Sequence, residues 1–171
     1  MKKRLFAAAL LTLLILTVTG CDSLSSITGG VNIKDAPFSA RMEIDTEEID
    51  FIANVKRLGM GLWEMEILEP ASIKGLLIKY DGSSVSSTMN GFTQTMPVEN
   101  VADSAVFLQI FRTIDNAISE IDPKGETVDG KYVLEGENYS IIFNPETDAP
   151  EEIKFPLSAI QAYISEFQPI A

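Results

Sequence analysis

The sequence has 171 residues, with 13 basic and 25 acidic side chains and no histidine, and its formal net charge is −12. Without histidine the chain lacks the usual general base at neutral pH and the commonest metal ligand, which excludes histidine-dependent triads and histidine-bearing zinc sites. An acidic surface repels phosphate groups, which argues against nucleic-acid binding and against a basic membrane-binding patch. We therefore expect a protein that is not an enzyme and needs no cofactor or metal. Serine–lysine, carboxylate-pair and all-oxygen metal mechanisms are the alternatives that this inventory leaves open.

The N-terminal segment has the parts of an export signal. Residues 1–4 carry three basic side chains, residues 5–18 form an apolar run, and small residues precede Cys21, the only cysteine. The apolar run is shorter than the ~20 residues that a membrane-spanning helix needs. An uncleaved anchor and an ordinary signal with an incidental cysteine are the two alternatives.

The stretch Val18-Thr19-Gly20-Cys21 resembles a bacterial lipobox. The resemblance implies that residues 1–20 are a lipoprotein signal peptide, that the chain is cut before Cys21, and that this cysteine carries a diacylglyceryl thioether. It also implies a lipid-anchored protein at the cell membrane, on the extracytoplasmic side, either extracellular or periplasmic. Lipidation would explain the position of a lone cysteine, which has no disulfide partner within the chain.

Residues 21–37 contain this cysteine and a segment rich in serine and glycine, which is typical of a flexible linker. The folded domain is expected at residues 38–171. Removing Lys2, Lys3 and Arg4 with the signal leaves 10 basic and 25 acidic residues, a balance of −15. The simplest interpretation of this charge is that it keeps the domain soluble.

The first half of the domain has the two-residue alternation of half-buried β-strands. Turn signals such as Asp81-Gly82 and Asn90-Gly91 separate the segments, so that the strands are expected to pair in sequence as an antiparallel meander. The predicted strands lie within residues 38–44, 49–55, 63–67, 76–80 and 85–89.

Residues 104–121 change to a helical period. Asp103 or Ser104 is a candidate N-cap, and Pro123 ends the segment. One apolar stripe recurs at three- and four-residue spacing and needs a sheet face to cover. The stripe consists of Phe107, Ile110, Phe111, Ile114, Ile118 and Ile121.

The chain after the helix returns to strands, at residues 131–134, 139–143 and 153–157. Residues 160–167 fit either a strand or a helix, and their β-branched and aromatic content favours a strand. Together these segments predict an α+β fold.

Several features together resemble the half-barrel lipoprotein-trafficking fold of the LolA and LolB proteins. They are the lipobox, the short antiparallel strands, the helix before the closing strands, and residues 62–82, in which a strand, Glu69-Pro70, Gly75 and Tyr80-Asp81-Gly82 follow in order. The chain also resembles small Gram-positive lipoproteins. The half-barrel resemblance implies a curved antiparallel sheet with one main helix on its concave face, and an apolar cavity for acyl chains or acylated proteins.

A helix about 10 Å across cannot cover a broad, twisted sheet alone, which leaves room for a hydrophobic ligand. We therefore expect a membrane-anchored lipoprotein that binds a lipid or an acylated protein. A fully packed core is the alternative, and it would indicate a non-catalytic structural or protein-interaction module of the cell envelope. The candidate cavity residues are Trp63, Met65, Phe107, Ile110, Phe111 and Ile114.

Residues 45–50 form a cluster of carboxylates, Asp45-Thr46-Glu47-Glu48-Ile49-Asp50. Such a cluster can bind calcium weakly, but it lacks the glycine and the spacing of an EF-hand loop. A solvated turn is the favoured interpretation.

Overall fold

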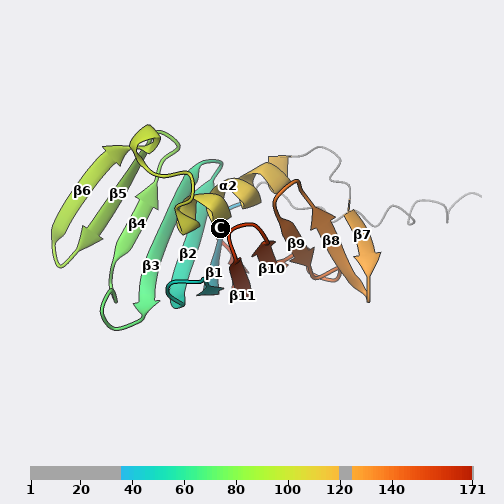
Figure 1. Cartoon of the computed structure of the whole chain (residues 1–171). Coiled ribbons are helices and arrows are strands. Elements are labelled where there is room, and N and C mark those ends of the chain that lie inside the picture. Colours follow the sequence, from blue (N-terminus) through green and yellow to red (C-terminus); the bar gives the residue numbers. More distant parts are fainter. Residues whose placement is uncertain (1–35, 120–124, 171) are drawn as a thin grey trace, which may run out of the picture.

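One antiparallel sheet of eleven strands dominates the computed structural model, which describes residues 36–119 and 125–170 (Figure 1). One α-helix, α2 (Val106–Ser119), and one short 3₁₀ helix, η1 (Val98–Asn100), accompany the sheet within these residues. The strands are β1 (Phe38–Asp45), β2 (Phe51–Gly59), β3 (Leu62–Glu69), β4 (Leu77–Tyr80), β5 (Ser84–Met89), β6 (Phe92–Pro97), β7 (Gly125–Val128), β8 (Lys131–Glu135), β9 (Ser140–Phe143), β10 (Pro150–Phe155) and β11 (Ile160–Pro169).

The two ends of the described chain meet in the middle of the sheet. The strand order is β6-β5-β4-β3-β2-β1-β11-β10-β9-β8-β7, so β1 and β11 join two meanders. Phe38 pairs with Pro169, Met42 pairs with Ile164, and the backbone N–H of Ile170 donates to the carbonyl of Pro37 at 2.9 Å. The edges of the sheet are β6 and β7, and they do not pair with each other.

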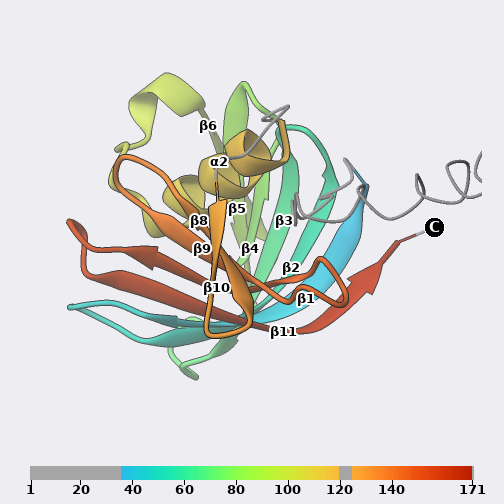
Figure 2. The ribbon, with the colours of Figure 1, turned by 90° about the vertical axis from the view of Figure 1, so that its right-hand side faces the viewer.

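Helix α2 lies on the concave face of the sheet, between the edge strands β6 and β7 in chain order (Figure 2). Its inward residues are buried, as the apolar stripe predicts. The expected α+β half-barrel, with one main helix on the concave face, is therefore confirmed. The buried helix residues are Leu108, Ile110, Phe111, Thr113, Ile114, Asp115 and Ala117.

Alternation along each central strand separates the two faces of the sheet. In β1 the buried positions are Phe38, Ala40, Met42 and Ile44, and the residues between them are more exposed. Antiparallel partners share a face, so the same core continues across the neighbouring strands. Burying such side chains contributes roughly 1.5–3 kcal/mol each and holds the helix against the sheet.

Two strands were not predicted from the sequence, and both lie at the edges. In β6 only Met96 is not exposed, and in β7 all four residues are exposed. Neither strand has the buried-and-exposed alternation that identifies a half-buried strand. The two-residue turn Asn90-Gly91, with φ of 51° and 82°, folds β6 back onto β5 as a tight hairpin.

The ambiguous segment near the C-terminus is the long strand β11, which makes the strand interpretation correct.

Helix α2 begins at Val106, two residues after the predicted start, and its predicted end at Ile121 lies outside the described residues. The predicted signal peptide, Cys21 and most of the linker also lie outside them. Within the described residues, no helix is both long and apolar enough to span a membrane.

Candidate functional site

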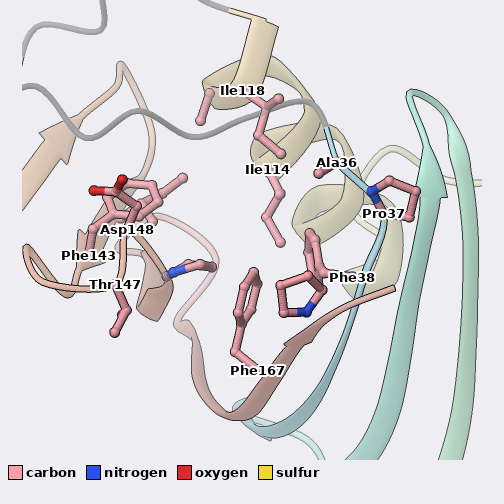
Figure 3. A pocket seen from close by; sticks show the side chains of 13 residues that line it. Ala36, Pro37, Phe38, Ile114, Ile118, Phe143, Thr147, Asp148 and Phe167 are labelled. Atoms are coloured by element: carbon pink, nitrogen blue, oxygen red, sulfur yellow. The ribbon is translucent and has the colours of Figure 1, made fainter. Parts of the chain in front are cut away.

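An apolar pocket of about 230 Å³ opens where β1 begins and β11 ends (Figure 3). It lies between the C-terminal half of α2, these two strands, β9 and the loop from β9 to β10. The lining residues are Ala36, Pro37, Phe38, Ile114, Ala117, Ile118, Ile141, Phe143, Thr147, Asp148, Pro150, Phe167 and Pro169.

Aromatic and branched side chains form the walls of the pocket. The rings of Phe38 and Phe167 lie 4.8 Å apart, and Figure 3 shows Ile114 pointing from α2 toward Phe167. Ile114 and Ile118 are four residues apart, so both point to the same side of the helix. The last part of the apolar stripe therefore faces this pocket instead of the closely packed centre of the sheet.

The polar lining comes from one loop. Thr147 and Asp148 lie between β9 and β10, and the other lining residues have apolar side chains. Among the residues that the structure describes, no lysine or arginine lines this pocket. The described lining therefore suits an apolar chain, and a carboxylate at the pocket mouth would meet the like charge of Asp148.

Of the six residues predicted from the sequence to line a cavity, only Ile114 lines this pocket. Trp63, Met65, Ile110 and Phe111 are buried in the packed core instead, where Trp63 stacks on Phe111 with ring centroids 4.6 Å apart. Phe107 is half-buried and packs against the same core. The five other candidate residues therefore pack against one another where α2 meets the sheet, and they do not line this pocket.

A buried ion pair between Arg57 and Asp115 fixes α2 to the sheet at this packed centre, and the expectations from the sequence did not include it. The Asp115 carboxylate accepts a hydrogen bond from Nε of Arg57 at 2.7 Å, from Nε1 of Trp63 at 2.8 Å and from the backbone N–H of Gly61 at 2.9 Å. Arg57 is fully buried, and its Nη1 also donates to the carbonyl of Ala36 at 3.4 Å.

A signal for this pair was present in the sequence. Arg57 continues the inward alternation of Ala53 and Val55, and Asp115 follows Ile114 within the apolar stripe. A charged residue at an inward position of a strand, with an opposite charge inside a helix stripe, indicates a buried pair. The pair lies next to Ile114 in sequence, so it also positions the helical wall of the pocket.

The acidic turn at residues 45–50 is organised by its own hydrogen bonds. The backbone N–H of Thr46 donates to the Asp50 carboxylate at 3.2 Å, and the Thr46 hydroxyl donates to the carbonyl of Ile49 at 2.7 Å. Among residues 36–119 and 125–170, no three potential metal ligands come together.

No protein-family model and no curated protein sequence matches this chain. The chain is similar to the solved structure of an uncharacterized conserved protein from Thermus thermophilus, with a TM-score of 0.51 and 14% identity over 81% of each chain. At this identity the similarity shows a shared fold.

Two other solved structures are similar to the chain at TM-scores below 0.5. A LolA superfamily protein from Nitrosomonas europaea has a TM-score of 0.44 and 13% identity, covering 84% of this chain and 91% of that one. A domain from Vibrio parahaemolyticus, described as an outer membrane lipoprotein-sorting protein domain, has a TM-score of 0.43 and 11% identity, covering 82% and 92%.

Proposed function

We propose that this protein is a lipoprotein, anchored through Cys21 at the extracytoplasmic side of a membrane, that binds one apolar chain in the pocket beside α2. The pocket carries the proposal, because it is an apolar cavity between a helix and the concave face of a sheet. The lipobox-like stretch before Cys21 supports the anchor.

The size of the pocket limits the ligand. Its volume of about 230 Å³ is below the roughly 300–1,000 Å³ of pockets for drug-sized ligands. A single acyl chain, or part of one, fits this volume better than a whole lipid does. Trp63, one of the candidate cavity residues, is buried and stacks on Phe111 of α2 outside this pocket.

The lining also limits the polar end of the ligand. Within residues 36–119 and 125–170, Asp148 and Thr147 are the polar side chains that line the pocket, and no lysine or arginine lines it. An ester-linked or amide-linked acyl chain avoids the like-charge contact that a free fatty acid would make with Asp148. We therefore propose neutral acyl groups, of a lipid or of an acylated protein, as the ligand class.

The ligand proposal can be tested with purified residues 22–171. We expect native mass spectrometry and lipid extraction to recover acyl lipids, and a neutral fluorescent monoacylglycerol to bind more tightly than a fluorescent fatty acid. The variant Ile118→Trp fills the pocket from its half-buried rim. It should weaken probe binding by at least about tenfold, or ~1.4 kcal/mol.

Val128→Trp is the matched control, because Val128 is an exposed aliphatic residue on the edge strand β7. Thermal unfolding of both variants shows whether the fold is intact. Unchanged binding by Ile118→Trp, or a preparation that holds no lipid and binds no probe, would contradict the ligand proposal. The protein would then fit a non-catalytic interaction module of the envelope, which the packed centre of the sheet favours.

The anchor is tested separately by replacing Cys21 with serine in the full chain and fractionating cells. We expect the membrane-bound fraction to fall by at least about tenfold, because acyl chains contribute ~0.8 kcal/mol of membrane binding per buried CH₂ group. A variant that stays in the membrane fraction at the wild-type level would show that another element holds the protein there.

The proposal includes no catalysis. The chain has no histidine, and a lipidated Cys21 would leave no thiol nucleophile. A broad hydrolase and transferase screen on residues 22–171 should find no turnover. Activity that a single serine or glutamate substitution abolishes would overturn this part of the proposal.

A further inference from the structure

The two edges of the sheet differ in charge and length. Every residue from 82 to 98 is uncharged, so the whole β5–β6 hairpin has no charged side chain in a protein with a net charge of −12. The other edge strand, β7, has only four residues and contains Glu126. Edge strands normally carry charges or are very short, which prevents them from pairing with another chain. By this criterion β7 is protected against pairing with another chain, whereas β6 is free to pair.

The register identifies the backbone groups that are free on β6. Met89 and Phe92 flank the two-residue turn, and a flanking pair of this kind exchanges backbone hydrogen bonds. Consistent with this alternation, the N–H of Val98 donates to the carbonyl of Ser83 at 2.9 Å. The intervening residues Thr93 and Thr95 therefore direct their N–H and C=O groups away from β5, and no described strand pairs with that side.

We propose that a second copy of this chain adds its own β6 to this edge, antiparallel, with the two-fold axis at Gln94. In this register Thr93 exchanges both backbone hydrogen bonds with Thr95 of the second copy, and the symmetry repeats the pair. A two-fold axis at Thr95 would instead place Thr93 opposite Pro97, which has no N–H to donate. With the axis at Gln94, the outward N–H and C=O groups of Thr93 and Thr95 all find hydrogen-bond partners in β6 of the second copy.

The side chains agree with this register. Phe92 is 83% exposed, the most exposed large apolar side chain in the described residues. Pairing about Gln94 places Phe92 opposite Met96 of the second copy on the same face, so each covers the other. The two threonines pair on the opposite face. An isologous contact of this kind is self-complementary, as a two-fold interface must be.

Charge favours a second copy at the β6 edge over the β7 edge, because β7 carries Glu126 and the β5–β6 hairpin carries no charge. Two molecules with a net charge of −12 repel each other, and the repulsion is smallest where the uncharged residues 82–98 face each other. The proposal is independent of the pocket, because none of the pocket residues lies in β5 or β6.

The test is disulfide cross-linking of the full chain in cells. In the proposed register residue 94 faces its own copy as a non-hydrogen-bonded pair, whose Cα atoms lie about 4.5 Å apart. This distance suits a disulfide, so Gln94→Cys should give a band at twice the monomer mass after mild oxidation, seen on a non-reducing gel. Gln94 is exposed, and the substitution should leave the fold intact.

Three controls accompany this variant. The wild-type chain shows whether Cys21 forms dimers by itself. Thr93→Cys places the thiol one residue away on the other face of the same strand, and Thr127→Cys places it on the edge strand β7. We expect at least about tenfold more dimer from Gln94→Cys than from either control, because only residue 94 brings its Cβ atom within disulfide range of itself.

A second substitution tests the hydrogen bonds. Adding Thr95→Pro to Gln94→Cys removes an outward N–H without breaking a bond to β5, and it should lower the dimer yield by about tenfold, whereas Thr95→Ala keeps the N–H and the yield. Equal cross-linking of Gln94→Cys and Thr93→Cys would overturn the register. If no dimer forms, or if the cross-linked product contains another protein, the proposal that a second copy pairs with the β6 edge is wrong.

Discussion

Asp115 is the residue on which the attachment of α2 depends most. Its carboxylate lies in the core, accepts three hydrogen bonds and balances the charge of Arg57. Three donors converge on it from the β2–β3 hairpin, so one side chain determines how the helix sits over the sheet. A buried pair is costly to break, because the opposite charge of the partner offsets the cost of burying each charge.

We expect Asp115→Asn to lower the free energy of unfolding by about 3–5 kcal/mol, because it removes the carboxylate charge that accepts the hydrogen bond from Nε of the buried Arg57. Urea unfolding followed by the fluorescence of Trp63 measures this. The control is Asp103→Asn, which removes the partner of Arg112 at the surface and should cost less than about 1 kcal/mol. Equal effects of the two variants would show that the buried pair does not hold the helix.

Asp81 stabilises the turn between β4 and β5 through its ionised carboxylate. Its carboxylate accepts hydrogen bonds from the backbone N–H groups of Ser84 and Ser83, at 2.6 and 3.0 Å, and from both hydroxyls. These bonds lower the pKa of Asp81 from 3.8 to about 2. Because the pKa is lower in the folded state, ionised Asp81 stabilises the fold above the unfolded-state pKa, and this contribution is lost as the pH falls through about 2.

Asp81→Asn should therefore be less stable than the wild type at pH 6, and the difference should shrink between pH 4 and pH 2. Urea unfolding of both proteins across this range measures the difference, in which the contributions of all other carboxylates cancel. A difference that stays constant with pH would show that the Asp81 turn does not depend on the ionised carboxylate.

At the scale of elements, the sequence predicted the helix and the strands that bury one face and expose the other. The stripe from Phe107 to Ile118 and the alternation of β1 and β3 arise because one face of each element meets the core. Strands β6 and β7 were missed for the opposite reason, because almost no residue in them is buried. Their pairing comes from the turn and from the neighbouring strand, which leave little trace in the hydrophobic pattern.

The hairpin of β5 and β6 depends on its turn. Gly91 has a φ of 82°, and a Cβ atom added there meets nothing within 4 Å, so Gly91→Ala should lose stability through backbone conformation alone. The expected cost is about 1 kcal/mol, with faster hydrogen exchange of the β6 amides. Gly59→Ala is the control, because its Cβ makes ordinary contact with Leu62 at 3.8 Å. Similar exchange in both variants would contradict the role of the turn.

At the scale of the whole molecule, the pocket was the hardest feature to predict. Its walls come from residues 36–38, 114–118, 141–150 and 167–169, which are distant in sequence. The apolar stripe identified the side of α2 that faces the sheet, and with it Ile114. It could not show where packing is complete, as at Trp63, and where a gap remains, because this depends on how side chains from separate strands fill the same space.

The pairing of β1 with β11 also bears on when the chain can fold during synthesis. Until β11 is available, β1 and β10 have no strand to join them, and the two meanders cannot form one sheet. The contact between residues 38 and 169 is among the longest-range contacts that residues 36–170 can make, and contacts of high sequence separation slow folding. A chain ending at residue 159 should therefore remain sensitive to pulse proteolysis, whereas a protease-resistant product of that length would contradict late closure. For a chain exported as proposed, late closure would keep the domain unfolded until nearly all of it has crossed the membrane.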